Sequence, residues 1–261
     1  MTFDWTFFWQ NLLTPRGTFL QGLSLTVVVS VLAMTLALAV GLVIALMRRS
    51  TFAPFRVFAS FYIWLIRGTP LLVQLVLIYT GFAAVGLFRF SDVDVFGLLI
   101  KAAVQAAIVG LVINESAYIS EIVRSGLDAI PVGQTEAARS LGMTGWASMR
   151  WIIMPQALKV MVPPLGNSFN GLMKTTSVLS VIGVSEMFLV AQSISSATFK
   201  TFEIFIVVAI YYLALTTIWT VIQALIEARL NRMVGVTTAP SIVGRLFGGR
   251  GAGTQIPVVE T

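Results

Sequence analysis

The stretch that decides the fold is residues 136–142, which read EAARSLG and are followed by Ile152 and by Met154-Pro155. This polar stretch lies inside a very hydrophobic chain. Two adjacent alanines after a carboxylate, with a glycine as the C-terminal stop and a new apolar run beyond it, are typical of a short helix between two membrane spans. The pattern therefore predicts a structured docking element rather than a flexible tether.

The composition independently indicates a membrane protein. Of the 261 residues, 57% are hydrophobic and 11% are charged, against roughly 25% charged residues in a soluble domain. The chain contains no cysteine and no histidine, which excludes disulfides, thiol nucleophiles, imidazole bases and the usual zinc ligands. We therefore expect no catalytic residues, no metal site and no cofactor.

Five apolar stretches are long enough to cross a bilayer as helices, which takes about 20 residues each. Lipid offers no partner for unpaired backbone groups, and the stretches lack the alternation of a membrane barrel, so we predict an all-α integral membrane protein with five transmembrane helices. The stretches are Leu23–Met47, Val57–Phe82, Phe96–Ser120, Val160–Ile182 and Ile204–Ile226.

The basic residues flank these stretches unevenly, which predicts the orientation. An N-out, C-in chain places eleven of them in the cytoplasm and four outside, as the positive-inside rule favours. The cytoplasmic set is Arg48, Arg49, Arg56, Arg124, Arg139, Arg150, Lys159, Arg229, Arg232, Arg245 and Arg250; the external set is Arg16, Arg89, Lys101 and Lys200. We therefore attribute the net charge of +6 to residues that set the orientation in the membrane, and not to a nucleic-acid-binding surface.

The longest polar connection, residues 121–159, then lies in the cytoplasm. It is too charged to cross the membrane and too regular to be a tether. Ile130-Pro131 predicts a turn, residues 134–141 a short helix, and Gly142 its C-terminal stop. An ordinary amphipathic loop helix on the bilayer surface is the simpler alternative.

The spacing of this connection resembles the permease subunits of ATP-binding-cassette (ABC) importers. Their signature reads Glu-Ala-Ala, three residues, Gly, nine residues, Ile, any residue, Leu, Pro. Here Met154 replaces the leucine, with little change in volume or polarity. The resemblance implies a type I importer permease that docks its ATPase subunit through Glu136, Ala137, Ala138, Gly142, Ile152 and Pro155.

Three further motifs are similar to the polar amino-acid uptake branch of these importers. They are Arg67-Gly68-Thr69-Pro70, extended to Gln74, then Glu121–Arg124 and Ala129–Gln134. The resemblance covers residues 23–232. It implies a multi-pass protein of the bacterial inner membrane that forms half of a pore with a second permease copy or paralogue. Its other expected partners are cytoplasmic ATP-binding subunits and an extracytoplasmic amino-acid-binding protein.

Polar residues inside the third and fourth stretches are candidates for the substrate pathway, because they are costly in lipid. Pro163-Pro164, Gly166 and Gly171 interrupt the fourth stretch, and broken helices at membrane depth commonly line a cavity. Close helix packing is the alternative explanation for each single residue. The candidates are Asn114, Glu115, Asn167, Asn170, Lys174 and Thr175.

The domain prediction has three parts. Residues 1–22 form an extracytoplasmic segment in which Trp5, Phe7, Phe8 and Trp9 are an interface anchor. Residues 23–232 form the permease domain with its coupling loop, and residues 233–261 form a cytoplasmic tail without fixed structure.

Two other classes of function stay open from the residues alone. A self-contained channel or ion-coupled secondary carrier would use Glu115 and Lys174 as its coupled pair. An intramembrane enzyme is disfavoured by the missing His and Cys, although Asp, Glu, Ser and Lys remain.

Overall fold

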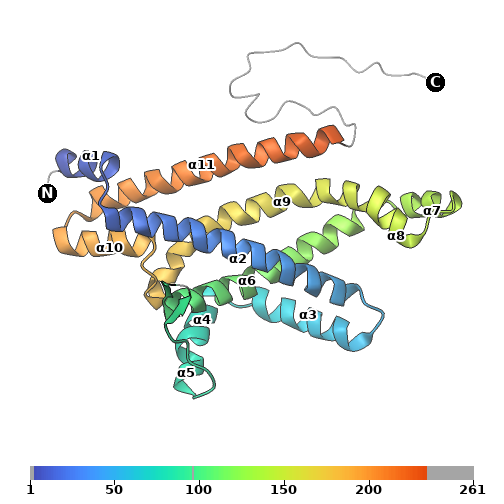
Figure 1. The fold of residues 1–261 in the computed structure, drawn as a ribbon, viewed down its shortest axis with the longest axis horizontal. Helices are drawn as coiled ribbons and strands as arrows, with labels where there is room; N and C mark the ends of the chain where they lie inside the picture. The colour runs from blue at the N-terminus through green and yellow to red at the C-terminus, as the bar shows by residue number, and fades with distance from the viewer. Residues whose placement is uncertain (1–2, 96, 234–261) are drawn as a thin grey trace, which may run out of the picture.

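The computed structural model describes residues 3–95 and 97–233, and these residues form an elongated bundle of helices (Figure 1). The predicted tail from residue 234 onward lies outside the described residues. The chain begins with the short helix α1 (Trp5–Leu13) and the long helix α2 (Gly17–Arg49). It then returns through α3 (Ala53–Arg67), which turns sharply into α4 (Leu71–Val76).

The middle of the chain contains an arm that projects from the bundle in Figure 1. Helix α4 continues through the π-helical turn η1 (Leu77–Gly81) into α5 (Phe82–Ala84). A hairpin of two antiparallel strands follows, β1 (Val93–Val95) and β2 (Leu98–Ile100), in which Val93 is opposite Ile100.

The second half contains the polar connection and two more long helices. Helix α6 (Ala102–Asp128) is followed by α7 (Val132–Ser140), α8 (Gly145–Ser148) and the π-helical turn η2 (Met149–Ile153). Next come α9 (Met154–Thr175), the 3₁₀ turn η3 (Thr176–Ile182) and α10 (Met187–Thr198). Helix α11 (Thr201–Met233) is the last described element.

The number of candidate spans agrees with the predicted membrane fold. Within the described residues, α2, α6 and α11 are each long and apolar enough to cross a membrane. Two bent pairs also qualify if each is one span: α3 with α4–α5, bent by 105°, and residues 145–182 with α10, bent by 54°. The part of the chain that the structure describes therefore contains three to five candidate spans.

Three predicted boundaries were wrong. The third span does not begin at Phe96, because residues 98–100 are paired in the hairpin and α6 begins at Ala102. Residues 121–128 and 154–159, predicted as loop, are the ends of α6 and α9. A helix continues past its apolar part wherever its charged side chains reach water or ion-pair partners, so hydropathy alone underestimates its length.

The core is centred on the contact between α2 and α6. Small residues recur every four positions on one face of α2, at Ala33, Ala37, Gly41 and Ala45, and all are buried. A Cβ atom at Gly41 would lie 2.7 Å from Cγ2 of Ile119 and 3.0 Å from the carbonyl oxygen of Ser116. Only glycine permits this approach, which places the two helices in direct backbone contact.

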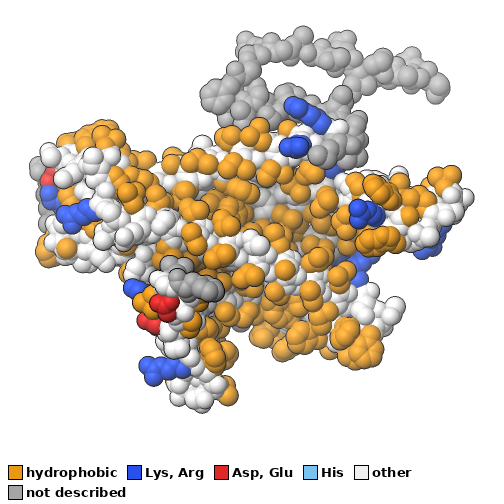
Figure 2. Space-filling view, viewed as in Figure 1, with side chains coloured by type: hydrophobic (Ala, Val, Ile, Leu, Met, Phe, Trp, Pro, Cys, Tyr) orange, Lys and Arg blue, Asp and Glu red, His pale blue; other side chains and the backbone are white. Residues whose placement is uncertain are grey.

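Outside this core the surface is mostly hydrophobic, with the basic side chains gathered toward the ends of the bundle (Figure 2). Exposed apolar side chains follow the long helices, among them Leu36, Val43 and Leu213. Such a surface suits lipid rather than water.

Candidate functional site

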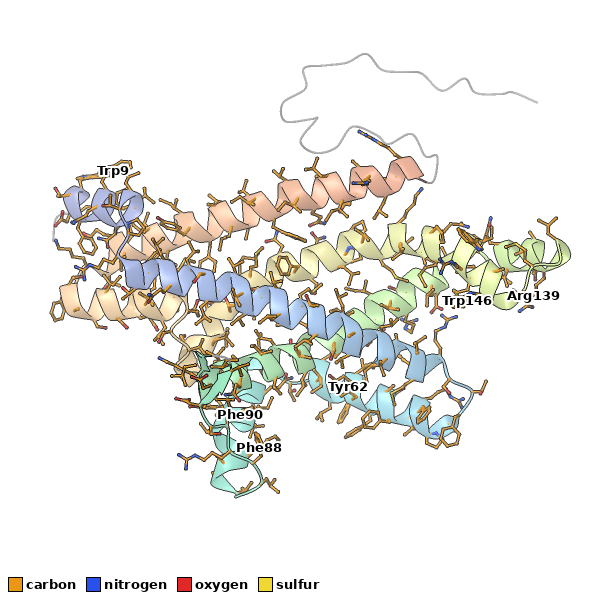
Figure 3. The ribbon with its side chains drawn as sticks, viewed as in Figure 1. Trp9, Tyr62, Phe88, Phe90, Arg139 and Trp146 are labelled. Atoms are coloured by element: carbon orange, nitrogen blue, oxygen red, sulfur yellow. The ribbon has the colours of Figure 1, made fainter. Side chains whose placement is uncertain are left out.

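The loop between α6 and α9, residues 129–153, forms the end of the molecule opposite α1. Arg139 and Trp146 lie in this loop and Trp9 lies at the other end of the bundle (Figure 3). The predicted turn and helix are confirmed, since Pro131 immediately precedes α7 and α7 ends at Ser140. We call residues 129–153 the α7–α8 loop.

Gly142 ends α7 in the conformation that the sequence predicted. Its φ of +75° lies in the left-handed region, which glycine adopts without the strain of a Cβ atom. The Gly142 N–H donates to the carbonyl of Arg139 at 2.9 Å, and the Met143 N–H donates to the carbonyl of Ala138 at 3.1 Å. These bonds satisfy the last carbonyls of α7 and turn the chain toward α8.

The predicted docking residues divide into an outward and an inward set. Glu136 and Ala137 are exposed, whereas Ala138 is only 3% exposed and packs inside the loop. Ile152 lies in η2, and Pro155 is the second residue of α9, which continues directly from η2. The two alanines therefore have different surroundings although they are adjacent in the sequence.

Sequence reasoning missed the apolar residues that this loop exposes. Leu141 is 82% exposed and Val132 is 72% exposed, and Trp146 and Trp151 are also largely exposed. Large apolar side chains on an otherwise polar loop are typical of a protein contact surface. The signal was present in the sequence as apolar residues beside the Glu-Ala-Ala stretch.

A second polar cluster forms the corner between α3 and α4, where the Arg67–Pro70 motif lies. Gln74 donates from Nε2 to the carbonyl of Ile66 and to the hydroxyl of Thr69, both at 2.8 Å. Asn114 on α6 donates to Oε1 of Gln74 at 3.0 Å. Asn114 thus holds the corner in place, because the carbonyls freed where a helix breaks need buried donors.

Arg67 lies at the same corner without an acidic partner among the contacts found there. Its guanidinium lies 5.2 Å from the centre of the Tyr118 ring, in a cation–π contact. Gly68 permits the turn, since a Cβ atom there would lie 2.8 Å from the carbonyl oxygen of Trp64. Pro70 is the residue before α4. The motif is therefore a structural corner of the broken span.

The candidate residues of α9 share one face of the helix. Asn167, Asn170, Gly171 and Lys174 follow the i, i+3, i+4, i+7 spacing of a helical stripe. Asn167 and Lys174 are exposed, and Asn170 is half-buried with its Oδ1 atom covered and unpaired within the described structure. We call these four residues the polar face of α9. Thr175 borders it and donates to the carbonyl of Gly171 at 3.0 Å.

The structure does not place Glu115 and Lys174 together. Glu115 on α6 accepts from the Ser168 hydroxyl at 2.8 Å. Ser168 and Lys174 are six residues apart on α9, which separates their directions by about 120°. Lys174 instead lines a hollow of about 590 Å³ with Ser177, Phe188 and Tyr212, on the side of α10 and α11.

Comparison with known proteins agrees with this geometry. The family described as "Binding-protein-dependent transport system inner membrane component" matches residues 37–232. The probable amino-acid permease protein YxeN of Bacillus subtilis (strain 168) is 36% identical over 88% of this chain and 97% of its own length. The glutamine transport system permease protein GlnP of Escherichia coli (strain K12) is 35% identical over 88% of this chain and 99% of its own.

A solved structure shows the same arrangement of helices. A chain from the crystal structure of an amino acid ABC transporter with histidines superimposes with a TM-score of 0.76 and 41% sequence identity. The match covers 88% of this chain and 100% of that chain. The ATPase of such a system is a separate subunit, so this chain is a transport subunit. The chain belongs to the multi-pass inner membrane permeases of ABC transporters, in the polar amino-acid uptake family.

Proposed function

We propose that this chain forms one half of an amino-acid translocation pathway, with a second permease copy or a paralogue as the other half. The observation that carries the proposal is the polar face of α9. Two amides and a lysine on one exposed helical stripe at membrane depth are costly against lipid. A second permease packed around a hydrated pathway would give them partners or water.

The unpaired Oδ1 of Asn170 supports this arrangement. Its amide oxygen is covered by protein and accepts no hydrogen bond within the described residues. A buried acceptor without a donor is unfavourable. Because this chain itself covers the atom, a donor on the second permease or on the cargo would reach it only after the helix or the side chain moves, as the transport cycle would require.

The proposed cargo is an amino acid with a polar side chain. The named relatives are a glutamine permease and a probable amino-acid permease, and the neighbouring structure is that of an amino acid transporter. Lys174 on the polar face offers a cation for a carboxylate, and Glu115 offers an anion on α6. Because the two side chains face different surroundings, they would act at different points of the pathway rather than as one pair.

The α7–α8 loop is the proposed docking surface for the ATPase subunit. It exposes Glu136 for a basic partner, and it exposes Leu141 for an apolar groove. The loop is also attached firmly to the spans, since Gln156 on α9 donates to the carbonyl of Ile152 at 2.8 Å and to Oε1 of Gln134 on α7 at 3.2 Å. The proposed orientation, N-out and C-in, places this loop in the cytoplasm beside the ATPase.

The test is reconstitution of the chain in proteoliposomes with its ATPase subunit and binding protein, followed by uptake of each of the twenty radiolabelled amino acids. We expect uptake that requires ATP, the ATPase subunit and the binding protein together. Equal uptake by the chain alone, driven by an ion gradient, would instead establish the secondary carrier. The family match favours the ATP-driven transporter.

A further inference from the structure

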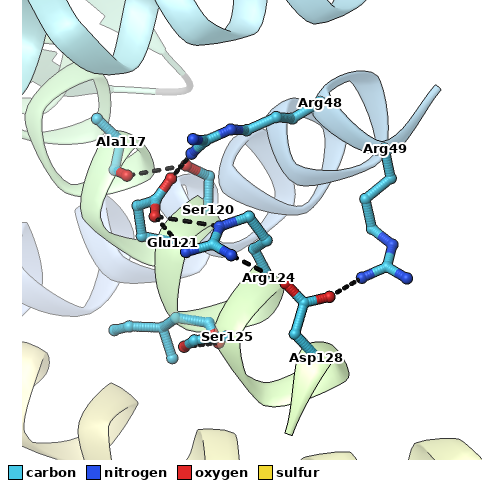
Figure 4. A network of polar contacts seen from close by, with 9 residues as sticks. Arg48, Arg49, Ala117, Ser120, Glu121, Arg124, Ser125 and Asp128 are labelled. Atoms are coloured by element: carbon cyan, nitrogen blue, oxygen red, sulfur yellow. Dashed lines mark hydrogen bonds and ion pairs between the residues drawn. The ribbon is translucent and has the colours of Figure 1, made fainter. Parts of the chain in front are cut away.

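A ring of five charged side chains joins the ends of α2 and α6 immediately before the α7–α8 loop (Figure 4). Arg48 and Arg49 are the last residues of α2, and the other three members lie on the last two turns of α6. We call this set the α2–α6 ring. Its members are Arg48, Glu121, Arg124, Asp128 and Arg49.

The charges alternate in sign along a series of ion pairs from Arg48 to Arg49, and the backbone of α2 joins the two ends of the series. Arg48 forms an ion pair with Oε1 of Glu121. Arg124 donates to Oε2 of Glu121 from Nε at 3.2 Å and from Nη2 at 3.1 Å, and it donates to Oδ2 of Asp128 from Nη1 at 2.9 Å. Arg49 ends the series by pairing with Oδ1 of Asp128, and it is bonded to Arg48 through the α2 backbone. Each carboxylate therefore lies between two guanidinium groups.

This geometry restrains the motion of α6 relative to α2 better than a single ion pair would. The ring makes two separate bridges between α2 and α6, and Arg124 ties the two bridging carboxylates together along α6. One bridge would let α6 swing about a single point, whereas two bridges resist both swinging and twisting. Glu121 is the most protected member, with a side chain only 19% exposed, so solvent screens its pairs least.

The ring lies immediately before the α7–α8 loop, so it affects how a movement of that loop reaches the spans. Only Ala129, Ile130 and Pro131 separate α6 from α7, a connection that reaches at most about 14 Å. The end of α6 also contacts the start of α9, because a Cβ atom at Gly126 would lie 2.3 Å from Cγ of Met161. A displacement of α7 must therefore pull on the end of α6, and the ring passes that pull to α2.

We infer that the α2–α6 ring transmits the movement of the docked α7–α8 loop to the spans, so that its members are positioning residues for coupling ATP hydrolysis to transport. This inference rests on the proposed function of the loop. Without the ring, the last turns of α6 would yield to the ATPase movement while α2 stayed in place. Hydrolysis would then continue with less cargo moved per ATP.

The experiment measures ATP hydrolysed per amino acid imported, in proteoliposomes that contain the chain, its ATPase and its binding protein. The cargo is the radiolabelled amino acid that the wild type imports. The variants are Glu121→Gln, Arg49→Gln, Asp128→Asn and the double variant of the last two. Arg56→Gln is the matched control, because it removes one arginine near the same end whose guanidinium, within residues 3–95 and 97–233, bonds only to the carbonyls of Ser50 and Thr51.

We expect the ratio of ATP to cargo to rise by about twofold in Arg49→Gln and in Asp128→Asn, as exposed pairs are weak, and by about fivefold in Glu121→Gln. The double variant should equal Asp128→Asn, because that substitution already removes the ion pair with Arg49 together with the pair to Arg124. ATPase retention on the membranes should stay at the wild-type level in all of them, and Arg56→Gln should match the wild type throughout.

Two outcomes would overturn the inference. If the ratio of ATP to cargo is unchanged in Glu121→Gln and in the double variant, and uptake is normal, the ring has no role in coupling. A parallel loss of membrane-inserted protein and of uptake, with the ratio unchanged, would show that the ring serves stability alone. Failure of the proposed function looks different, because the wild type itself would then import nothing or would not retain the ATPase.

Discussion

Trp219 on α11 donates its indole N–H to the carbonyl oxygen of Gly166 on α9, at 2.8 Å. One turn along α11, Gln223 donates to the carbonyl of Pro163 at 3.2 Å. These two carbonyls lie on either side of Pro164, in the part of α9 that contains Pro163 and Pro164. The contact therefore joins the last helix to the one that carries the polar face.

The first prediction follows from the absence of a side chain at Gly166. A Cβ atom there would lie 2.3 Å from Cδ of Gln223, so Gly166→Leu should displace the Gln223 side chain from its bond to the Pro163 carbonyl and cost about 1–3 kcal/mol. We expect a lower midpoint in thermal unfolding of the detergent-solubilised protein. Gly171→Ala is the control, because no atom of the described part of the chain lies within 4 Å of a Cβ atom at Gly171. Equal midpoints in both variants would contradict the close contact.

The second prediction concerns docking of the ATPase subunit. Gly142→Val should distort the end of α7, since a β-branched residue adopts a φ of +75° poorly, at a cost of about 1–2 kcal/mol. Glu136→Lys should repel a basic partner. Both variants should insert normally, lose ATP-driven uptake and release the ATPase from membranes at lower salt. Retention and uptake at wild-type levels would mean that the loop is an ordinary surface element.

The third prediction concerns the pathway. Lys174→Met and Glu115→Gln should each lower uptake by about tenfold or more while insertion stays normal, because each removes a charge expected to meet cargo or water at low dielectric. Lys159→Met is a suitable control, since it removes a lysine near the start of the same helix. Wild-type transport in the Lys174 and Glu115 variants would assign both residues to packing.

The fourth prediction concerns orientation. If the uneven distribution of basic residues sets the topology, a reporter fused after Arg232 should be cytoplasmic and one inserted at Asp92 should be external. Asp92 precedes the start of α6, and Arg232 lies in the last turn of α11. An external reporter after Arg232 would refute the N-out, C-in arrangement with five spans.

The fifth prediction concerns pH and the attachment of α1. The hydrogen bond from Lys200 lowers the pKa of the Asp4 carboxyl below its ordinary value of 3.8, and the Phe7 N–H adds to this. Because the folded pKa is lowered, this attachment is complete above pH 3.8 and weakens as the pH falls through the lowered value. Asp4→Asn should loosen α1 at neutral pH, measured as faster hydrogen exchange of residues 5–13. Exchange independent of this substitution would show that α1 is held by packing alone.

The sequence by itself determined the class and much of the organisation of this protein. The length of the apolar stretches required helices, because backbone groups in lipid need hydrogen-bond partners within the same segment. The Glu-Ala-Ala spacing located α7, and Gly142 located its end, because these are local effects of helix termination. Gly68 and Pro70 lie at the bend in the second predicted span, where local helix-breaking residues are expected to act.

Tertiary structure alone decided which polar residues meet. Asn114 and Glu115 are adjacent on α6, yet one bonds to Gln74 at the corner and the other to Ser168 on α9. Likewise, hydropathy placed Arg48 and Glu121 in separate loops, whereas the packing of α2 on α6 at Gly41 brings them into one ring. Side-chain partners depend on how helices approach one another in space, and that approach is set by the packing of small residues far from the charges themselves.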